Sequence, residues 1–400
     1  MHQESHNILF VHEACGSFGG AESNAFATAT ELRARGHRVG LLTQRRTGHA
    51  ESAWEELFEG NLFWLHDGAA HALAAFQADV IYVHKWEEQE SLAAFLDGAT
   101  PTVRMVHDHD IYCLRSYRYH PLTRTPCTRA AGLACVVPCL APLKRQRGGV
   151  LPFRWASYFS KQRELALSRR FDRNIVATEF MKGELLVNGF DAQRIEIIPP
   201  VPRPGVVLRS EFSERNRVLF AGQIIRGKGV DVLLRALALV REKFEAVIVG
   251  DGHHRVACEK LAQKLGLADR VKFTGFLPQA EVHEFYRDTS VVVVPSVWPE
   301  PMGLVGLEAM RAALPVVAFD SGGIGAWLRD GESGFLVPRM DTAQFARRLD
   351  ELLADKTLAR TMGQRGLERV TRDFDFDRYI AALEGLFGRM TADRRHAQAA

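Results

Sequence analysis

The feature that most constrains this chain is a repeated alternation of short apolar runs with helix-length amphipathic stretches. The short runs are rich in Val and Ile and end at polar residues, as buried parallel strands do. Stretches such as Ala21–Arg35 and Glu88–Leu96 lie between them. The alternation predicts βαβ units, and therefore an α/β protein with doubly wound sheets. The predicted strands are Ile8–Val11, Val39–Thr43, Val80–His84, Thr102–Val106, Val218–Ala221, Ala246–Gly250, Val271–Thr274, Val291–Pro295 and Pro315–Phe319.

A proline-rich run, Pro199–Gly205, divides this pattern into two domains. Proline fixes φ and lacks an N–H donor, so the run cannot continue a sheet. The 400 residues also exceed the roughly 250–300 that one core usually supports. We expect an N-terminal domain over residues 1–204, a C-terminal domain over 205–375, and a helix with a polar, disordered tail over 376–400.

Between about residues 111 and 154 the alternation stops, and the composition turns to Pro, Arg, Cys and Gly. We expect an irregular Cys-rich insertion there, followed by a helix over Trp155–Arg170 and a strand over Asn174–Thr178. The final helices are expected at Asp341–Leu353, with Asp341 as N-cap, and at Leu358–Val370 and Arg378–Phe387.

Composition excludes several classes of protein. The chain is 46% apolar and 25% charged, as ordinary soluble globular proteins are. A net charge of +3 does not argue for a nucleic-acid partner. No run approaches the ~20 apolar residues of a membrane span, and the start resembles no signal peptide. We expect a cytoplasmic protein.

Glycine-rich turns follow several predicted strands. The first, Gly16–Glu22, includes Gly19 and Gly20, and its spacing differs from the dinucleotide-binding pattern. Such a turn allows close approach of a ligand to backbone N–H groups, although packing alone also favours glycine there. The second, Gly222–Gly229, carries Gln223, Arg226 and Lys228. Two cations in such a turn suit a diphosphate, and the alternative is an ordinary solvated turn.

The segment Pro295–Ala309 places Glu300 and Glu308 eight residues apart. Glu300 falls in the turn after a strand, and Glu308 is expected about two turns into a helix that begins near Gly303. The start of that helix offers N–H groups to a phosphate. Glu300 could accept hydrogen bonds from sugar hydroxyls while Glu308 reaches a ribose; the alternative is a charged helix start.

Taken together, these motifs resemble the glycosyltransferase family 4 group of GT-B enzymes over nearly the whole chain. The E-x(7)-E pattern of Glu300 and Glu308, followed by Pro315–Ala318 and Ser321–Gly323, carries the resemblance. It implies two Rossmann-like domains facing each other across a cleft, and a metal-independent, configuration-retaining transfer from a nucleoside-diphosphate sugar. By the same resemblance Glu300 contacts the donor sugar, Glu308 the ribose and Lys228 the diphosphate, with Phe276 near the base and Met302, Gly303 and Leu304 at the donor.

Two residues depart from that family's pattern. Gln223 stands where the family usually has Arg, so Arg226 or Lys228 would carry the charge, and Met302 replaces the commoner Phe. The resemblance places His107 at the family's active-site histidine, which contacts the donor sugar. Asp108 and Asp110 form a D-x-D pattern that we interpret as a coincidence, because that metal motif belongs to a different fold.

Four of the six cysteines, Cys113, Cys127, Cys135 and Cys139, fall within the insertion. They could hold a structural Zn²⁺, or they could form disulfides or remain free thiols. No cofactor is expected for catalysis. After them, Lys144–Arg147 and Pro152–Phe159 combine cations with aromatic residues. This segment either docks on the inner face of the cell membrane or packs as an ordinary amphipathic helix.

The sequence thus predicts a glycosyltransferase that extends a polysaccharide, lipopolysaccharide or other glycan or lipid-linked acceptor. Closure of a hinge would bring His107 and the acceptor to the donor sugar. The rival hypotheses are a degenerate nucleotide-sugar-binding scaffold, suggested by Gln223, and a sugar-nucleotide epimerase of similar architecture.

Overall fold

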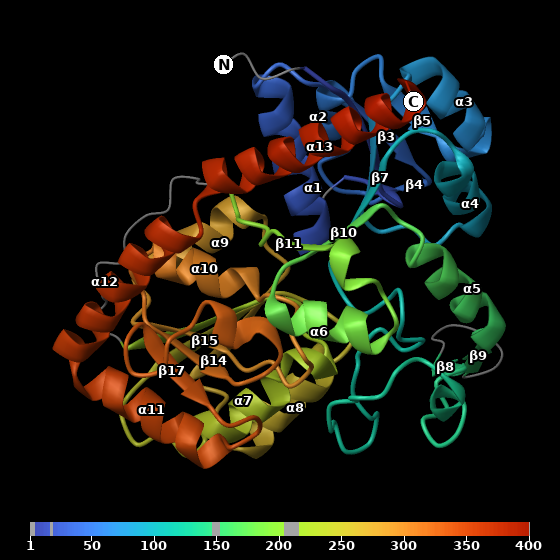
Figure 1. Cartoon of the computed structure of the whole chain (residues 1–400). Coiled ribbons are helices and arrows are strands. Elements are labelled where there is room, and N and C mark those ends of the chain that lie inside the picture. Colours follow the sequence, from blue (N-terminus) through green and yellow to red (C-terminus); the bar gives the residue numbers. More distant parts are fainter. Residues whose placement is uncertain (1–4, 17–18, 146–152, 204–215, 400) are drawn as a thin grey trace. The chain divides into compact units, whose positions relative to one another are not determined.

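The computed structural model describes residues 5–16, 19–145, 153–203 and 216–399. The chain divides into two compact units (Figure 1). Unit 1 contains residues 1–118, 127–203 and 376–400, and unit 2 contains residues 119–126 and 204–375. The C-terminal helix therefore belongs with unit 1, and a short piece of the insertion belongs with unit 2. The two units are not the continuous segments that the sequence suggested. Of the proline-rich linker, Pro204 and Gly205 lie outside the described residues.

Unit 1 is built on a seven-stranded parallel sheet in the order β11-β10-β7-β6-β1-β3-β5. The five strands predicted in this region form, each within one or two residues of its expected ends. Two edge strands, β5 and β11, had not been predicted because each is only three residues long. The strands are β1 (Asn7–Val11), β3 (Arg38–Thr43), β5 (Leu62–Trp64), β6 (Val80–Val83), β7 (Thr102–Met105), β10 (Arg173–Val176) and β11 (Ile195–Ile197), and two short strands, β2 (Ala14–Cys15) and β4 (Arg45–Arg46), pair separately.

Unit 2 has a six-stranded parallel sheet in the order β14-β13-β12-β15-β16-β17. All five predicted strands are confirmed, and β17 is added at one edge. Each unit is thus a doubly wound, Rossmann-like α/β unit, as the alternation predicted. The strands are β12 (Arg217–Ala221), β13 (Glu245–Val249), β14 (Val271–Gly275), β15 (Val291–Val294), β16 (Val316–Phe319) and β17 (Gly334–Val337).

Some of the helices begin at a residue whose side chain caps them, namely α4, α5, α6, α11 and α12. Asp341 accepts a hydrogen bond from the Gln344 amide at 2.8 Å, which confirms it as the N-cap of α11. No helix in the described residues is long and apolar enough to cross a membrane. Unit 1 contains α1 (Gly20–Ala34), α2 (Glu51–Leu57), α3 (Ala69–Phe76), α4 (Gln89–Asp97), α5 (Tyr158–Ser168), α6 (Glu179–Val187) and α13 (Phe376–Ala399); unit 2 contains α7 (Val230–Leu237), α8 (Arg255–Lys264), α9 (Gln279–Tyr286), α10 (Leu304–Arg311), α11 (Thr342–Ala354) and α12 (Lys356–Asp373).

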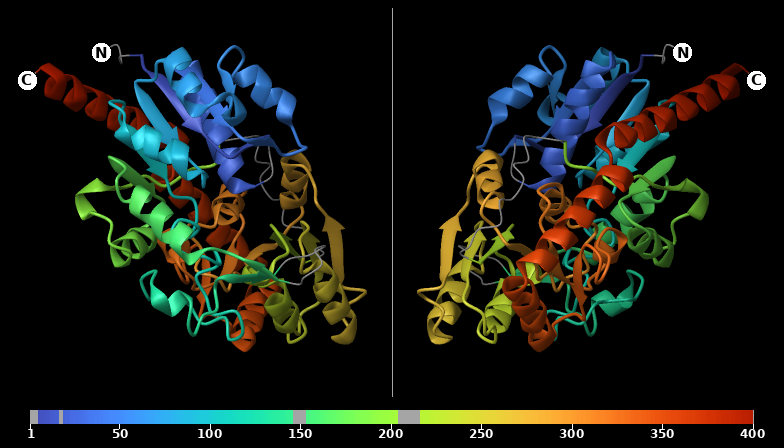
Figure 2. Two further views of the ribbon diagram at one scale, coloured as in Figure 1. Left: turned by 90° about the vertical axis from the view of Figure 1, so that its right-hand side faces the viewer. Right: turned by 90° about the vertical axis from the view of Figure 1, so that its left-hand side faces the viewer.

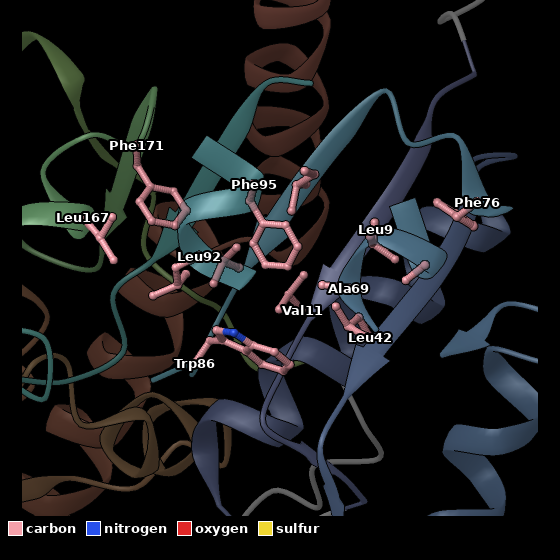
Figure 3. Close-up of a cluster of buried hydrophobic side chains, with 13 residues drawn as sticks. Leu9, Val11, Leu42, Ala69, Phe76, Trp86, Leu92, Phe95, Leu167 and Phe171 are labelled. Carbon is pink, nitrogen blue, oxygen red and sulfur yellow. The ribbon is translucent and has the colours of Figure 1, made fainter. Parts of the chain in front are cut away.

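The core on one face of the unit 1 sheet is formed by side chains of β1, β3 and β6 with those of α3, α4 and α5 (Figure 3). Phe76 shows why one strand position must be glycine. A Cβ atom at Gly40 of β3 would lie 2.6 Å from the Phe76 ring, so only glycine lets the ring pack on the strand. The cluster consists of Leu9, Val11, Leu42, Ala69, Ala72, Phe76, Ile81, Val83, Trp86, Leu92, Phe95, Leu167 and Phe171.

The last helix, α13, packs on unit 1 although it is last in the sequence (Figures 1 and 2). The Tyr379 hydroxyl lies 3.0 Å from both Asn24 Nδ2 and Thr28 Oγ1. Near the end of the helix, Arg394 Nε donates to the Ala99 carbonyl at 2.6 Å. The expected disordered tail is therefore wrong, because α13 continues to Ala399. The prediction of disorder was based on the polar composition of the tail. The tail is nevertheless rich in Ala and Arg, which favour helices, and residues such as Arg394 have tertiary partners.

The insertion is less irregular than its sequence suggested. Strands β8 (Leu143–Arg145) and β9 (Phe153–Trp155) pair antiparallel, and a 3₁₀ turn, η2, spans Leu133–Cys135. Trp155 consequently belongs to β9, and α5 begins three residues later than Trp155, with the Ser157 side chain as its cap. The alternation rule could not detect this hairpin because each strand has only three residues.

Candidate functional site

The candidate donor site lies where the strand order of unit 2 reverses. The chain proceeds from β12 outward through β13 and β14, then returns to β15 on the other side of β12. In open α/β sheets, the loops that leave adjacent strands on either side of such a reversal diverge, and the crevice between them is the usual ligand site. The loop after β12 carries Gln223, Arg226 and Lys228, and the loop after β15 carries Glu300. The topology thus brings two separate sequence motifs to one place.

Lys228 and Glu300 meet there directly. Lys228 Nζ lies 2.6 Å from Glu300 Oε1, and Ser296 Oγ donates to the same oxygen at 2.5 Å. Glu300 is only 2% exposed, whereas about a quarter of the Lys228 side chain is accessible. The ammonium also lies 5.2 Å from the centre of the Trp298 ring. A buried carboxylate therefore holds a partly exposed ammonium at the carboxyl end of the sheet.

Close backbone approach at this site requires glycine. Gly229 has φ of +71°, and a Cβ atom there would lie 1.9 Å from the Pro295 carbonyl oxygen. Gly322 has φ of +67°, and its Cβ would lie 2.4 Å from the Glu300 carbonyl oxygen. The Gly323 amide donates to that same Glu300 carbonyl at 2.6 Å. The predicted Ser321–Gly323 loop thus contacts the backbone of Glu300 directly and helps to hold it in place.

The second glutamate of the pattern, Glu308, lies on α10. That helix begins at Leu304 after Gly303, whose φ is +84°, as the sequence predicted. Glu308 is its fifth residue and so lies just past the first turn, not two turns in. The Tyr286 hydroxyl donates to Glu308 Oε2 at 3.3 Å. Burial, together with the Glu308 charge, raises the pKa of Tyr286 well above its usual value, so the phenol stays a neutral donor.

The other predicted donor residues are placed as follows. Gln223 and Phe276 are exposed, the latter by 53%, and Met302 is buried. Leu304 opens α10. Arg226 Nη1 donates to the Pro121 carbonyl at 3.0 Å, so part of its guanidinium is already engaged by the protein.

Pro121 belongs to a short strap, residues 119–126, that packs within unit 2. Arg124 of the strap is 7% exposed and forms a bidentate ion pair with Asp231 in the first turn of α7, at 3.1 and 2.6 Å. Arg339 Nη1 donates to the Arg124 carbonyl at 2.7 Å. The strap therefore braces the turn that carries Arg226 and Lys228. Nothing in the sequence joined this part of the insertion to the donor loop.

Unit 1 has its own strand-order reversal, between β1 and β6. A cavity of about 90 Å³ lies there, at the carboxyl ends of β1, β6 and β7. Most of its polar lining was not singled out by the sequence, because no motif marks residues that converge from three strands. The lining residues are Glu13, His84, Lys85, Trp86, Glu87, Arg104, Met105, Val106, His107, Asp108, Asp110, Ile111 and Glu164.

His107, the predicted catalytic histidine, lines this cavity. Its Nε2 lies 2.8 Å from His84 Nδ1, and the two rings stack with centroids 5.1 Å apart. Burial, together with the nearby His12, Lys85 and Arg104, lowers the pKa of His107 to about 3. Burial likewise lowers the pKa of His84 well below its usual value. Both rings are therefore neutral at neutral pH, and one donates a hydrogen bond to the other.

The D-x-D pattern has a structural explanation. Lys85 Nζ lies 3.0 Å from Asp108 Oδ2 and 3.2 Å from Asp110 Oδ2, so a lysine occupies the place between the two carboxylates. The two carboxylates thus have a structural partner, and the absence of a metal role for the pattern stays a prediction. The carboxylates in turn raise the pKa of Lys85 despite its burial.

The four clustered cysteines do not assemble into a metal site. Across residues 5–16, 19–145, 153–203 and 216–399, no three His, Cys, Asp or Glu side chains are grouped to hold a metal ion. All six cysteines are free thiols, so no disulfide forms either. Cys127 instead accepts a contact from Arg118 Nη1 at 3.6 Å. The described residues therefore contain no cluster of ligands for the Zn²⁺ that the sequence suggested.

Gly19 and Gly20 stand at the start of α1 in unit 1, where Gly19 is the N-cap residue. Ser17 and Phe18 of the same turn lie outside the described residues. Gly16 is required for packing, because its φ is +115° and a Cβ atom there would lie 2.1 Å from Thr47 Oγ1.

Comparisons with known proteins agree with this architecture. Residues 18–201 match the family described as Glycosyltransferase Family 4, and residues 209–369 match Glycosyl transferases group 1. The chain belongs to the family 4 glycosyltransferases of the GT-B fold, the class that the two Rossmann-like units and the E-x(7)-E pattern define.

Among curated proteins, the chain is 34% identical over 254 residues to a D-inositol 3-phosphate glycosyltransferase of Salinispora tropica, covering 56% of this chain and 52% of the relative. It is 29% identical over 401 residues to the protein of the same name from Nocardia farcinica, covering 90% and 83%. The chain thus spans about half the length of the first of these relatives.

Among solved structures, the fold is similar to that of HepE from Anabaena, in complex with UDP and glucose. The TM-score is 0.73 at 20% identity, and 96% of this chain and 99% of that chain are covered. The sucrose-phosphate synthase of Thermosynechococcus elongatus gives a TM-score of 0.75 at 20% identity with the same coverage.

Proposed function

We propose that this chain is a retaining glycosyltransferase that moves a sugar from a nucleoside-diphosphate sugar to a glycan or lipid-linked acceptor, as in polysaccharide or lipopolysaccharide synthesis. The observation that carries the proposal is the Lys228–Glu300 pair, 2.6 Å apart at the strand-order reversal of unit 2. A buried carboxylate and a partly exposed ammonium are the groups that a sugar diphosphate requires there, one for hydroxyls and one for phosphate charge.

In this mechanism Lys228 stabilises the negative charge that develops on the leaving diphosphate. No catalytic metal ion is invoked, because the ammonium supplies the positive charge. The contacts of Glu300 with Lys228 and Ser296 both use Oε1. That arrangement orients Oε2 of this residue for hydroxyls of the donor sugar. Tyr286 acts as a positioning residue, because its hydrogen bond to Oε2 orients Glu308 for the ribose.

The neutral His107 suits contact with a sugar rather than general-base work near neutral pH, because its lowered pKa makes it a weak base. Retention of configuration would follow if the acceptor attacks the face of the sugar from which the diphosphate leaves, as the resemblance to family 4 implies. The solved relative HepE, whose complex contains UDP and glucose, supports a uridine nucleotide as the first donor base to try.

The test is a thermal-shift panel of UDP-, GDP-, ADP- and dTDP-sugars, followed by a transfer assay with the donor that raises the melting temperature. A ligand that binds only the native state raises stability by mass action, by about 2.7 kcal/mol at 100 Kd. We expect one base to stabilise the protein, and NMR of the product to show retained anomeric configuration. Stabilisation without turnover would favour the scaffold hypothesis, and conversion of the donor without acceptor would favour an epimerase.

We further propose that the insertion seats unit 1 on an anionic membrane surface. Leu143 of β8 lies directly opposite Trp155 of β9, and Phe159 follows at the start of α5. Trp155 is 68% exposed and Phe159 81%, which is unusual for side chains of this size. The adjoining sequence is basic, with Lys144, Arg145 and Arg147. Of these, Arg147 and the neighbouring Pro152 lie outside the described residues.

Replacing Trp155 and Phe159 together by Ala is expected to weaken binding to vesicles that contain anionic phospholipid by at least about tenfold. The reason is that each aromatic ring would bury roughly 150 Å² or more in the interface. Cosedimentation with anionic and zwitterionic vesicles measures the change. Val256→Ala, at a residue 62% exposed on α8, is the matched control. Equal binding of the double variant and the unaltered protein would contradict membrane docking.

A further inference from the structure

The unit 1 cavity contains polar atoms that the protein itself does not satisfy. Arg104 Nε, Glu164 Oε1 and His84 Nε2 are buried and have no hydrogen-bond partner among the described residues. Arg104 Nη2 lies 3.9 Å from Glu164 Oε1, which is beyond hydrogen-bond distance. All three residues line the cavity, and each is at most 3% exposed. Buried polar atoms normally have a hydrogen-bond partner, so three buried atoms without one around a single cavity indicate that a ligand binds there. The occupant must supply an acceptor for Arg104 and a donor for Glu164.

Hydroxyl groups meet both needs, because each donates one hydrogen bond and accepts others. The volume also fits. At about 30 Å³ per water-sized group, a cavity of about 90 Å³ holds roughly three such groups, which is the hydroxyl-bearing edge of one sugar ring. The mouth is more open than the floor, since Lys85, Asp108 and Asp110 retain between a fifth and a third of their side-chain exposure.

The charges at the cavity oppose a phosphate. Five carboxyl groups line it, those of Glu13, Glu87, Asp108, Asp110 and Glu164, against the two cations Lys85 and Arg104. Lys85 is held between Asp108 and Asp110. Arg104 uses Nη1 to donate to Ser168 Oγ at 2.7 Å and Nη2 to donate to the Trp86 carbonyl at 3.2 Å. Both cations are therefore already engaged by groups of the protein, and neither offers its full charge to a phosphate.

We propose that this cavity is the subsite for the acceptor, and that it takes an edge of an uncharged, unphosphorylated sugar or polyol. This inference rests on the proposed transfer function and specifies its acceptor class. It also separates this chain from the relatives whose names specify D-inositol 3-phosphate, a phosphorylated compound. Glu164 is the residue that would contact an acceptor hydroxyl, through Oε1. Lys161, which pairs with Oε2 of the same carboxylate at 2.5 Å, would hold it in place.

The test compares glucose, glucose 1-phosphate, glucose 6-phosphate and glucosamine, which share one ring and differ in charge, by saturation-transfer NMR on the full chain with UDP present. Glucose is expected to bind at least about tenfold more tightly than either phosphate and more tightly than glucosamine. Glu164→Gln is expected to weaken glucose binding severalfold, because the orphaned acceptor loses its charge. Glu90→Gln, at an exposed residue in the first turn of α4, is the control.

Three results would overturn the proposal. They are tighter binding of a phosphate, tighter binding of glucosamine, or glucose binding that Glu164→Gln leaves unchanged. Asp110→Asn provides a second variant, in which loss of one carboxylate should reduce the discrimination against phosphates. UDP affinity, measured in the same samples, distinguishes a failure of the donor site of unit 2 from a failure of the acceptor subsite of unit 1. Loss of UDP binding would contradict the donor site of unit 2, whereas the probe comparison reports on the unit 1 cavity alone.

Discussion

Replacing Glu300 by Gln is expected to lower the rate of sugar transfer by about 10²–10³-fold while leaving UDP affinity nearly unchanged. Glu300 accepts hydrogen bonds from Lys228 and Ser296 through one oxygen and is 2% exposed, so its charge acts in a site shielded from water. Gln keeps the size of the side chain but loses the charge that strengthens hydrogen bonds to sugar hydroxyls. UDP lacks the sugar that is transferred, so its binding does not report on this contact.

Steady-state kinetics with the cognate UDP-sugar and calorimetric titration with UDP measure the two quantities. Glu368→Gln, at an exposed residue of α12, is the matched control and should behave as the unaltered protein does. Urea unfolding checks the fold, and a loss of more than a few kcal/mol would call for the Glu300→Asp variant instead. A normal transfer rate in Glu300→Gln would show that the Glu300 carboxylate does not contact the donor sugar.

Replacing Lys228 by Ala is expected to produce the reverse pattern, a loss of UDP affinity of about 10²-fold. The ammonium is the cation closest to Glu300 at the strand-order reversal, with about a quarter of its side chain accessible to a ligand. A charge-assisted hydrogen bond to phosphate contributes roughly 1.5–3 kcal/mol, which corresponds to about ten- to 150-fold in affinity. Lys264→Ala, at an exposed position of α8, is the control.

The Lys228→Ala variant is also expected to affect the stability of the protein. Removing Lys228 leaves the buried carboxylate of Glu300 without its cation, and breaking a buried pair in this way is usually destabilising. The double variant Lys228→Ala/Glu300→Gln removes both charges, and should recover stability without recovering UDP affinity. Unchanged UDP affinity in Lys228→Ala would move the diphosphate site away from this loop. Recovery of affinity in the double variant would show that the single variant had only disturbed the fold.

The elements that could be predicted from the sequence are those whose signal is local. Strands such as β15 and β16 are continuous apolar runs whose residues are all buried, so composition alone identifies them. Gly303 marks the start of α10 because only glycine readily adopts its φ of +84°. Glu300 and Glu308 could be selected from their spacing and from the family pattern. Neither signal depends on knowing which strands are neighbours.

The elements that could not be predicted depend on residues far apart in the chain. Arg124 pairs with Asp231 across 107 positions, so nothing in the insertion indicated that residues 119–126 brace the donor loop. Arg226 was expected to bind diphosphate, and the Pro121 carbonyl engages part of its side chain. The polar C-terminal tail is helical because it has partners such as Ala99, almost three hundred residues away.

The sequence by itself determined the class of fold, the strands of both sheets other than the edge strands β5, β11 and β17, and the spacing of Glu300 and Glu308 in one segment. These follow from periodicity and spacing, which are properties of neighbouring residues. The tertiary structure alone decided that Lys228 meets Glu300, that Lys85 separates Asp108 from Asp110, and that His84, Arg104 and Glu164 surround one cavity. The physical reason is the order of the strands, because it determines which loops emerge side by side, and strand order is a non-local property that no window of sequence contains.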